Sequence, residues 1–320
     1  MKSTQIVRAL AIAAAALVPF AASASQWPTQ PVRIIVPYSP GGGGDSVIRV
    51  LSDRLAERLG QPVVIENKPG ASGYIGAQMV AKAQPDGYTL LLGFDGSIAV
   101  APHLIKAPFD AEKDFAPVTK LSDATLVLAS SSELPVKSLP ELLEYSKTHE
   151  LEFGSSGLAT TTHLAGELLA LRSGMNLRHI PYKGGGQAVI DVAGGQIPLI
   201  FTVIPTVAGF LKDGRINALA VSTQQRTAVL PDVPTIAESF PGYDVSSWYG
   251  LFAPVGTPPD VLLRLQREVA EVLKTPEVAK QYETNGFVPV GNTPDEFAAQ
   301  VAADVKKWAE VVKEADVSLN

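Results

Sequence analysis

Residues 32–45 read VRIIVPYSPGGGGD and decide how the first part of this chain folds. The apolar, β-branched run at 32–36 has the composition of a buried strand, and the apolar residues between 47 and 59 have helical spacing. The four glycines at 41–44 carry no Cβ, so a ligand can approach the main chain closely. The first N–H groups of the helix have no intrahelical partner and point toward this loop. Such a strand–loop–helix corner predicts an anion-binding site.

Asp45 or Ser46 is a natural N-cap for this helix, and Gly60 is the signal for its end. The alternation continues with a strand, a helix and a strand at residues 63–66, 74–83 and 89–93. This βαβαβ order predicts parallel strands, with the glycine loop at the carboxyl end of the first one. Open α/β sheets bind their ligands at that edge.

A second series of alternating strands and helices follows residue 121. Strands are expected at residues 125–129, 151–154, 178–181, 198–203, 218–222 and 248–253. Helices are expected at residues 139–146, 162–171, 187–193, 206–211, 260–273, 277–285 and 294–314. The alternation indicates an α/β fold with mainly parallel strands.

Residues 1–24 have the pattern of a secretory signal peptide. Lys2 and Arg8 give a positive start, residues 9–20 are apolar without a break, and residues 22–24 form a small-x-small cleavage site. The apolar stretch is too short to span a bilayer, and no later uncharged run has spanning length. We therefore expect an exported protein without direct membrane insertion, which in a Gram-negative bacterium resides in the periplasm.

The composition excludes several classes of protein. No cysteine occurs, which excludes disulfides, thiolate metal sites and lipid attachment to an N-terminal cysteine. Removal of Lys2 and Arg8 with the signal peptide takes the formal net charge from −6 to −8. This acidic balance argues against binding to nucleic acids or anionic membranes, which relies on Lys and Arg. The remaining 296 residues exceed one typical core and indicate two domains.

Three further corners share the composition of the glycine loop. Residues 154–163 read GSSGLATTTH, residues 182–186 read YKGGG, and residues 93–97 read GFDGS. Each lies between a strand and a helix and offers N–H donors and small hydroxyls. One such corner is most simply a tight turn. Several of them in both series indicate a shared ligand site, in which local dipoles hold a small anion.

The glycine loop does not fit a nucleotide site. It lacks the Lys-Ser/Thr ending of a P-loop, and Ser46 stands where a dinucleotide fingerprint needs glycine or alanine. An exported protein also lacks a supply of ATP or NAD. We therefore expect no cofactor.

Catalytic motifs are few, with no Gly-x-Ser-x-Gly elbow and no cysteine nucleophile. His163 stands at a predicted helix start with Glu167 four residues later, which leaves two interpretations open. The pair holds a metal or orients a base, as in a secreted hydrolase with a nearby Ser or Thr. Alternatively, His163 hydrogen-bonds the loop or faces a ligand. Two ligands do not make a metal site, so we favour the second interpretation and expect neither catalysis nor a metal.

Asp95 and Lys183 also have two interpretations each. An acid at position 95 would repel a carboxylate unless it faced a ligand ammonium, amide or hydroxyl, and otherwise it caps the helical segment after Gly96. Lys183 either adds charge to the site or lies on the surface. Trp248 and Tyr249 are interpreted as core or hinge packing and not as a stacking platform.

Motifs in order along nearly the whole chain resemble those of the tripartite tricarboxylate transporter substrate-binding proteins, the Bug (Bordetella uptake gene) family. The opening residues 27–45, with WP, PVRIIVPY and PGG followed by Asp45, resemble the start of that family. Further matching motifs are NKPGA at 67–71, PDGYTL at 85–90, DFAPV at 114–118, HIPYKG at 179–184, ALAV at 218–221 and PDVPT at 231–235.

This resemblance implies a type II periplasmic-binding-protein-like fold, in which two α/β domains joined by two crossing strands close around a ligand. Domain 1 would comprise residues 27–124 plus 247–320, and domain 2 residues 125–246. The resemblance further implies a monomer without catalytic activity. It would bind a small carboxylate (a dicarboxylate, aromatic acid or amino acid) and deliver it to a membrane permease.

Members of the family grip carboxylates with main-chain amides and hydroxyls of facing loops. Carried over to this sequence, the implied ligand-binding residues are Tyr38, Ser39, Gly42, Gly43, Ser156, Thr161, His163, Tyr182, Lys183 and Gly184. Thr202 stands where many relatives have an acidic residue, and Phe94 and Asp95 look specific to this chain. With Ser97 from the same corner, we expect these positions to contribute to specificity. In an alternative interpretation, the protein binds the same kind of ligand but reports it to the sensor kinase of a two-component system instead of delivering it to a permease.

Overall fold

A computed structural model describes residues 27–314, so the predicted signal peptide, residues 1–24, lies outside the described residues. The first elements are β1 (Val32–Val36), α2 (Gly43–Leu59), β2 (Val63–Asn67), α3 (Tyr74–Ala81) and β3 (Thr89–Phe94). β1 lies between β2 and β3 and is parallel to both. The predicted βαβαβ order is therefore confirmed, and the glycine loop, residues 41–44, follows the carboxyl end of β1.

β1 is covered on both faces, which explains why four of its five residues are apolar and buried, with Arg33 as the exposed exception. Val32, Ile34 and Val36 belong to one hydrophobic core together with buried residues of α2. Ile35 belongs to a second core together with residues of α3. Because successive side chains of a strand point to opposite faces, a strand with helices on both sides has apolar residues directed to each face.

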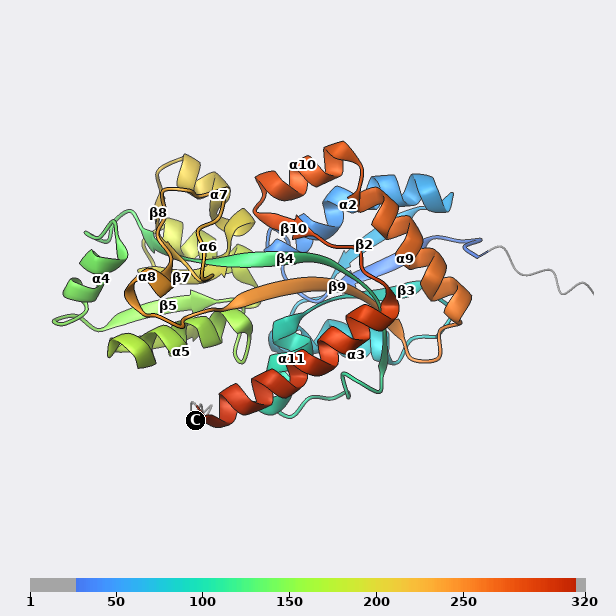
Figure 1. The fold of residues 1–320 in the computed structure, drawn as a ribbon, viewed down its shortest axis with the longest axis horizontal. Coiled ribbons are helices and arrows are strands. Elements are labelled where there is room, and N and C mark those ends of the chain that lie inside the picture. Colours follow the sequence, from blue (N-terminus) through green and yellow to red (C-terminus); the bar gives the residue numbers. More distant parts are fainter. Residues whose placement is uncertain (1–26, 315–320) are drawn as a thin grey trace, which may run out of the picture.

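Two long strands connect the two halves of the molecule. β4 (Phe115–Ser131) and β9 (Ser246–Pro254) are antiparallel and pair with each other over residues 115–125 of β4. The end of β4 continues past β9 and pairs with two further strands through residues 126–131. Figure 1 shows β4 and β9 running along the long axis of the molecule from one half into the other.

The second half repeats the parallel arrangement of the first. Its elements are α4 (Leu139–Tyr145), β5 (Leu151–Ser155), α5 (Thr161–Ser173), β6 (Leu177–Pro181), α6 (Gly185–Ala193), β7 (Leu199–Val203), α7 (Ile204–Lys212), β8 (Ile216–Val221) and α8 (Ile236–Ser239). β5 lies between β6 and β7 and is parallel to both. The strand order through both halves is β2-β1-β3-β9-β4-β7-β5-β6, with β8 and β10 also paired to β4.

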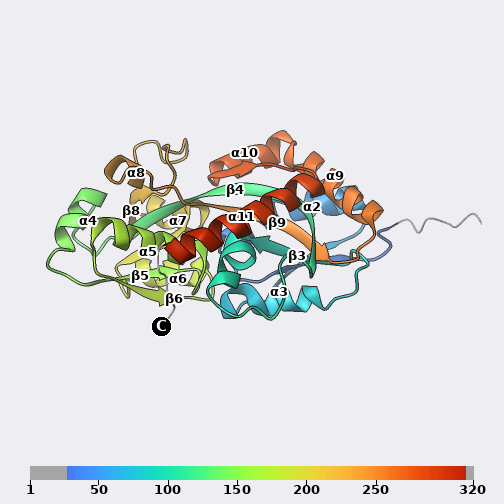
Figure 2. The same ribbon diagram turned by 60° about the horizontal axis from the view of Figure 1, so that its bottom comes forward.

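The C-terminal elements return to the first half. They are α9 (Pro259–Leu273), α10 (Pro276–Thr284), β10 (Phe287–Pro289) and α11 (Pro294–Glu314). α9 and α10 pack against α2, whereas α11 contacts β4. Figure 2 shows α11 extending along the molecule from the first half toward the second. We use "first half" for β1–β3, α2, α3 and these C-terminal elements, and "second half" for α4–α8 and β5–β8.

Two sequence-based boundaries are wrong. α2 begins at Gly43 with Gly42 as its N-cap, whereas the sequence predicted Asp45 or Ser46 as the N-cap. The Asp45 carboxylate instead accepts a hydrogen bond from the N–H of Gly41 at 3.2 Å and fixes the loop from within the first turn. The strand expected at 125–129 is the last part of β4, because residues 115–125 gain their strand conformation by pairing with the distant β9.

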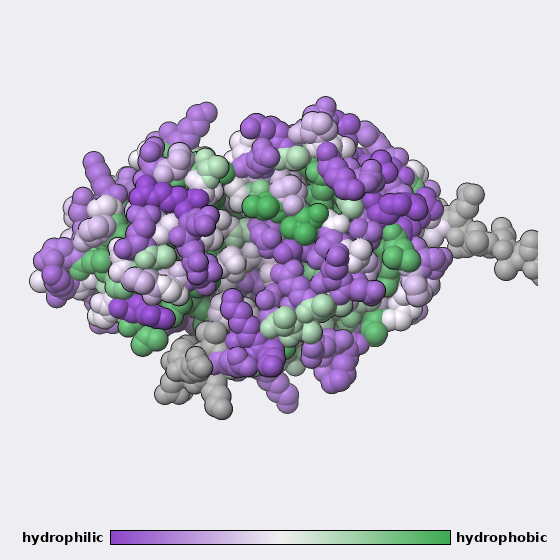
Figure 3. Space-filling model, in the orientation of Figure 1, coloured by the Kyte–Doolittle hydropathy of each residue, from purple (hydrophilic) through white to green (hydrophobic). Residues whose placement is uncertain are grey.

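The surface is mainly hydrophilic on the face shown in Figure 3, where exposed apolar side chains form small separate groups. The large apolar side chains that are more than half exposed come from different parts of the fold and include Ile75, Leu171, Ile190, Leu263 and Val288. Within residues 27–314, no helix is both long enough and apolar enough to cross a bilayer.

Gly250 on β9 allows α11 to pack closely against the sheet, and a methyl group there is expected to destabilise the protein. An added Cβ would lie 2.1 Å from Cζ of Phe297, a fully buried residue of α11. Overpacking of this kind costs about 1–3 kcal/mol. We expect Gly250→Ala to lower the urea midpoint of unfolding accordingly.

Gly209 in α7 is the matched control, because no atom lies within 4 Å of a Cβ built there. Gly209→Ala should leave stability unchanged or raise it by roughly 0.5–1 kcal/mol, since alanine is the better helix former. Equal unfolding midpoints for the two variants would contradict the proposed packing of α11.

Candidate functional site

The glycine loop of the first half lies in contact with the loop that precedes α6 in the second half. The N–H and the hydroxyl of Ser39 both donate to the main-chain oxygen of Lys183, at 3.2 and 3.0 Å. A Cβ on Gly186 would lie 2.5 Å from the main-chain oxygen of Pro40. The two main chains therefore touch, and the halves are closed over the space between them.

A pocket of about 390 Å³, including its opening to solvent, lies where these loops meet. Its wall contains residues from both halves and from the crossing strand β9. The lining residues are Tyr38, Gly42, Gly43, Gly44, Phe94, Ser156, Thr162, Gly185, Thr202, Val203, Ser247 and Tyr249. This wall, formed by described residues, contains no Lys, Arg, His, Asp or Glu.

Two helices present their first turns at this wall. α2 has Gly42 as its N-cap and α6 has Gly184, and neither helix receives a side-chain hydrogen bond at its cap. The N–H groups of the first turn have no intrahelical acceptor, and the helix dipole makes this end positive. An anion between the two helices therefore meets donors from both halves of the molecule.

The first turns of α2 and α6 have no space for a side chain at Gly43 or Gly185. A Cβ on Gly43 would lie 2.3 Å from the Tyr249 hydroxyl oxygen and 2.3 Å from Cγ2 of Val203. A Cβ on Gly185 would lie 2.5 Å from Oγ1 of Thr202. Side chains at these positions would fill the pocket and push its two sides apart.

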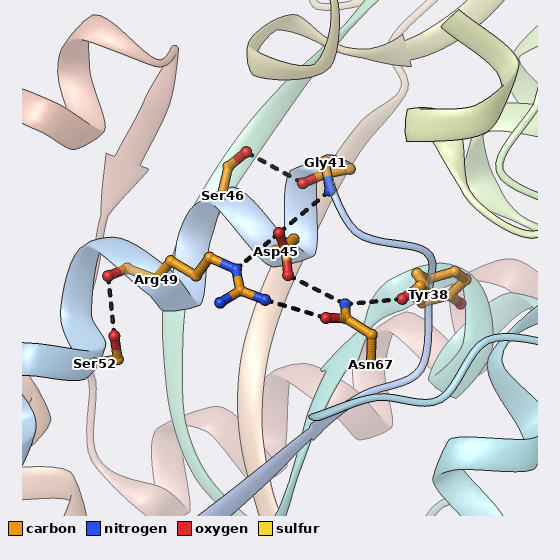
Figure 4. A network of polar contacts seen from close by, with 8 residues as sticks. Tyr38, Gly41, Asp45, Ser46, Arg49, Ser52 and Asn67 are labelled. Atoms are coloured by element: carbon orange, nitrogen blue, oxygen red, sulfur yellow. Dashed lines mark hydrogen bonds and ion pairs between the residues drawn. The ribbon is translucent and has the colours of Figure 1, made fainter. Parts of the chain in front are cut away.

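A polar network behind the pocket holds the glycine loop in place (Figure 4). Besides the Gly41 N–H, the Asp45 carboxylate accepts hydrogen bonds from Nε of Arg49 at 2.9 Å and Nδ2 of Asn67 at 3.1 Å. Asn67 Nδ2 also donates to the main-chain oxygen of Tyr38. Burial alone would raise the pKa of the Asp45 carboxyl, but the hydrogen bonds from Arg49, Gly41 and Asn67 outweigh it and lower that pKa.

Hydroxyl groups supply the remaining polar atoms of the wall. Thr162 is engaged internally, because its Oγ1 accepts from the Ser156 N–H at 3.0 Å. Ser156, Thr202 and Tyr249 line the pocket, and no hydrogen bond within residues 27–314 engages their hydroxyl groups. Burial raises the pKa of the Tyr249 phenol, so that this group remains a neutral donor. Neutral donors of this kind suit an uncharged or anionic oxygen of a ligand.

Aromatic rings form the apolar part of the wall. The Phe94 ring contacts Tyr38 edge to face, with centroids 4.8 Å apart, and stacks on Tyr249 at 6.1 Å. The Tyr38 hydroxyl donates to the main-chain oxygen of Ser72. The pocket thus combines one aromatic side with one side of amides and hydroxyls.

Six of the fourteen residues expected to bind ligand lie on the pocket wall, namely Tyr38, Gly42, Gly43, Phe94, Ser156 and Thr202. Ser39, Lys183 and Gly184 lie beside it in the contact between the loops. The hydroxyl of Ser97 donates to the main-chain oxygen of Phe94, and that of Tyr182 donates to Asp191 on α6. These side chains support the wall from outside.

Asp95 lies directly behind the wall. Its side chain is only 1% exposed and accepts hydrogen bonds from the hydroxyls of Thr161 and Ser247. It occupies the N-cap position of the short π-helical turn η2 (Gly96–Val100), but its side chain makes no cap hydrogen bond there. The Asp95 side chain therefore makes no cap hydrogen bond to η2, and Asp95 is not among the residues that line the pocket.

His163 is held by its own loop, which is the interaction that the sequence favoured. Its Nδ1 accepts from the N–H of Ala159 at 3.2 Å, and its Nε2 lies 3.3 Å from Oε1 of Glu167. The ring stacks on His179, whose Nε2 lies 2.6 Å from the hydroxyl of Ser155. Burial and the neighbouring His163 lower the pKa of His179 to about 3. Within residues 27–314, no three His, Cys, Asp or Glu residues are grouped to hold a metal.

Tyr249 and Ser247 are the wall residues that sequence reasoning missed most clearly. Tyr249 was interpreted as core or hinge packing, and its place on β9 explains why, because it is 7% exposed and also part of the pocket wall. Gly44, Gly185, Thr162 and Val203 were also not singled out. Gly44, Thr162 and Gly185 lie inside the corners described from the sequence, and Val203 follows the predicted Thr202, so the corners indicated the region but not every lining residue.

Comparison with known proteins places the chain in a family. Residues 47–317 match the family described as "Tripartite tricarboxylate transporter family receptor". The chain is 37% identical to Protein BugT of Bordetella pertussis over 302 residues, which covers 93% of each chain.

Two solved structures have the same fold. The periplasmic binding protein BugD is 35% identical, with a TM-score of 0.87 over 91% of this chain and 99% of BugD. R. palustris Rpa4515 with adipate is 34% identical, with a TM-score of 0.88 over 91% of this chain and 99% of that one. The mixed α/β periplasmic-binding-protein fold expected from the sequence is confirmed, and the chain belongs to the tripartite tricarboxylate transporter receptor family.

Proposed function

We propose that this protein captures a small carboxylate between its two halves and delivers it to a membrane permease of the tripartite tricarboxylate type. One observation carries the proposal: two helix N-termini from different halves, both led by glycine and both without a side-chain cap, line one pocket. The adipate in the structure of R. palustris Rpa4515 supports the ligand class. The family consists of transport receptors and not of enzymes.

The division into domains follows from the crossing strands. We propose that residues 27–124 plus 247–320 form one domain and residues 125–246 the other. In support, Ala124 of β4 is directly paired with Ser247 of β9, so both proposed boundaries lie at one level of the sheet. Only these two strands then pass between the domains through the sheet, which suits a hinge.

Ligand binding would favour the closed state, because only that state brings both sets of donors to one anion. The amides of Gly43 and Gly44 belong to the first half, and that of Gly185 belongs to the second. Tyr249 and Ser247 on the crossing strand complete the wall. We propose that the receptor acts as a monomer, and the pocket wall built from the described residues of one chain is consistent with this.

We also propose that the protein is periplasmic, with residues 1–24 as a cleavable signal peptide. The positively charged start, the short apolar stretch and the small residues at 22–24 support this proposal. The relative BugD is a periplasmic binding protein.

A ligand screen tests the proposed function directly. We expect at least one carboxylate among mono-, di- and tricarboxylates, aromatic acids and amino acids to raise the unfolding temperature. A ligand at 100 times its dissociation constant adds about 2.7 kcal/mol to the free energy of unfolding. Calorimetric titration should then give saturable binding, and chromatography should recover the ligand unchanged. No stabilisation by any of these compounds, or chemical conversion of the one that binds, would contradict the proposal.

Gly43→Ala tests whether the two halves close on the ligand. The new methyl group would meet Tyr249 and Val203, which lie on different sides of the pocket, and would hold them apart. We expect affinity for the carboxylate found in the screen to fall tenfold or more, equivalent to about 1.4 kcal/mol.

The control for this variant is Gly209→Ala, which adds a methyl group at an exposed position of α7 with no atom within 4 Å and should bind as the unchanged protein does. In small-angle X-ray scattering, addition of ligand should decrease the radius of gyration of the control. The radius of gyration of Gly43→Ala should not decrease. Unaltered affinity in Gly43→Ala would reject the pocket as the binding site.

A further inference from the structure

Asp95 connects the first half to the second half and to the crossing strand β9. It follows the carboxyl end of β3 in the first half. Its Oδ2 accepts a hydrogen bond at 2.7 Å from Oγ1 of Thr161, the first residue of α5 in the second half. Its Oδ1 accepts from the hydroxyl of Ser247 on the crossing strand β9.

We propose that Asp95 is a positioning residue that fastens the closed halves together and takes up a proton as they close, so that the ligand binds more tightly at mildly acidic pH. This inference rests on the proposed function, because it takes closure around a carboxylate as the binding event.

The residues that Asp95 fixes belong to the pocket. Ser247 is a lining residue, and Thr161 precedes Thr162, another lining residue. Phe94, which precedes Asp95, forms the aromatic side of the wall. A negative charge at Asp95 would thus lie directly behind the wall of a pocket that holds an anion.

Among the described residues, no lysine or arginine acts on the Asp95 carboxyl. The ionisable groups that act on its carboxyl are Tyr38 before α2, Tyr249 on β9 and Asp304 on α11. Asp304 accepts from the indole N–H of Trp248 and is itself acidic. On α5, His163 is paired with Glu167 and stacked on His179. A buried carboxylate that receives hydrogen bonds from two hydroxyls and from the N–H of Gly96, with an acid beside it, is poorly compensated for its loss of water.

Burial raises the pKa of the Asp95 carboxyl to about 7, although the hydrogen bonds from Ser247 and Thr161 act in the opposite direction. Opening removes Thr161 and admits water, which returns the pKa toward the usual value for Asp, about 3.9. The closed state therefore holds a proton that the open state releases. In the protonated form, the carboxyl donates to one of the two hydroxyls, which can turn to accept it.

The sign of the pH effect follows from this difference. Because the closed-state pKa is the higher one, closure is favoured as pH falls from above about 7 toward 4, and the advantage is lost as pH rises through 7. Linkage between values of about 7 and 3.9 predicts an affinity about 30-fold higher at pH 5.5 than at pH 8. The last carboxyl of a di- or tricarboxylate begins to protonate at the acidic end of this range, so each affinity is expressed for the fully ionised ligand.

Calorimetric titration with the carboxylate found in the screen tests the inference between pH 5.5 and 8. We expect the affinity to fall about 30-fold from pH 5.5 to pH 8. Near pH 6, binding should take up close to one proton per ligand, which is measured from the dependence of the binding heat on the ionisation enthalpy of the buffer. Asp95→Asn keeps a polar group of the same shape without the charge. It should bind with nearly constant affinity at all these pH values, close to that of the unchanged protein at pH 5.5.

Asp260→Asn, on the exposed first turn of α9, is the matched control and should retain the full pH dependence. Thr161→Val removes the hydrogen bond between the halves and serves as a second variant if Asp95→Asn fails to fold. It should lower affinity at pH 8 severalfold and keep a pH dependence.

Two results separate this inference from the proposed function. Failure of every carboxylate to bind at any pH would overturn the proposed function and this inference with it. Binding with pH-independent affinity and no proton uptake would overturn the role of Asp95 alone. An unchanged pH dependence in Asp95→Asn would do the same.

Discussion

The rest of the structure depends on one contact, in which the main chains of two glycine-rich loops touch across the boundary between the halves. The amides of these loops lie at helix N-termini, and the contact leaves space for a ligand but none for side chains at Gly43, Gly185 or Gly186. The charges near the loop are neutralised outside the pocket, where Asp45 is bonded to Arg49. The pocket wall itself therefore stays neutral, and its field comes from oriented peptide groups.

The crossing strands relate this contact to the fold as a whole. β4 pairs with strands of both halves, and β9 begins at the level where the halves separate, so the ligand pocket and the proposed hinge share residues of β9. Tyr249 pairs with Phe94 of β3 and also lines the pocket, whereas Ser247 pairs with Ala124 at the point where the halves separate. A shift of β9 during opening would thus move pocket groups directly, without an intervening element.

Local patterns explain how much of this could be predicted from the sequence. The run at 32–36 and the glycines after it encode a parallel strand and a ligand corner, because both depend on neighbouring residues only. The start of α2 was missed because a helix that begins with two glycines contradicts propensity, and Asp45 is held partly by Asn67, 22 residues away. Asp95 was ambiguous for the same reason, since its two hydroxyl partners lie 66 and 152 residues away. The pocket role of Tyr249 likewise depends on strand pairing that no local pattern shows.

A pocket without a cation makes closure essential to binding. One exposed helix N-terminus stabilises an anion by only about 0.3–1 kcal/mol, because water screens the dipole. When the two helix ends converge on a space from which water is excluded, the same dipoles act at a lower effective dielectric constant and their attraction grows. Opening separates Gly43 from Gly185 and readmits water, so the attraction from both helices weakens at once. In the proposed mechanism the ligand would therefore leave on opening alone, since the wall formed by the described residues offers no charged side chain to pair with it.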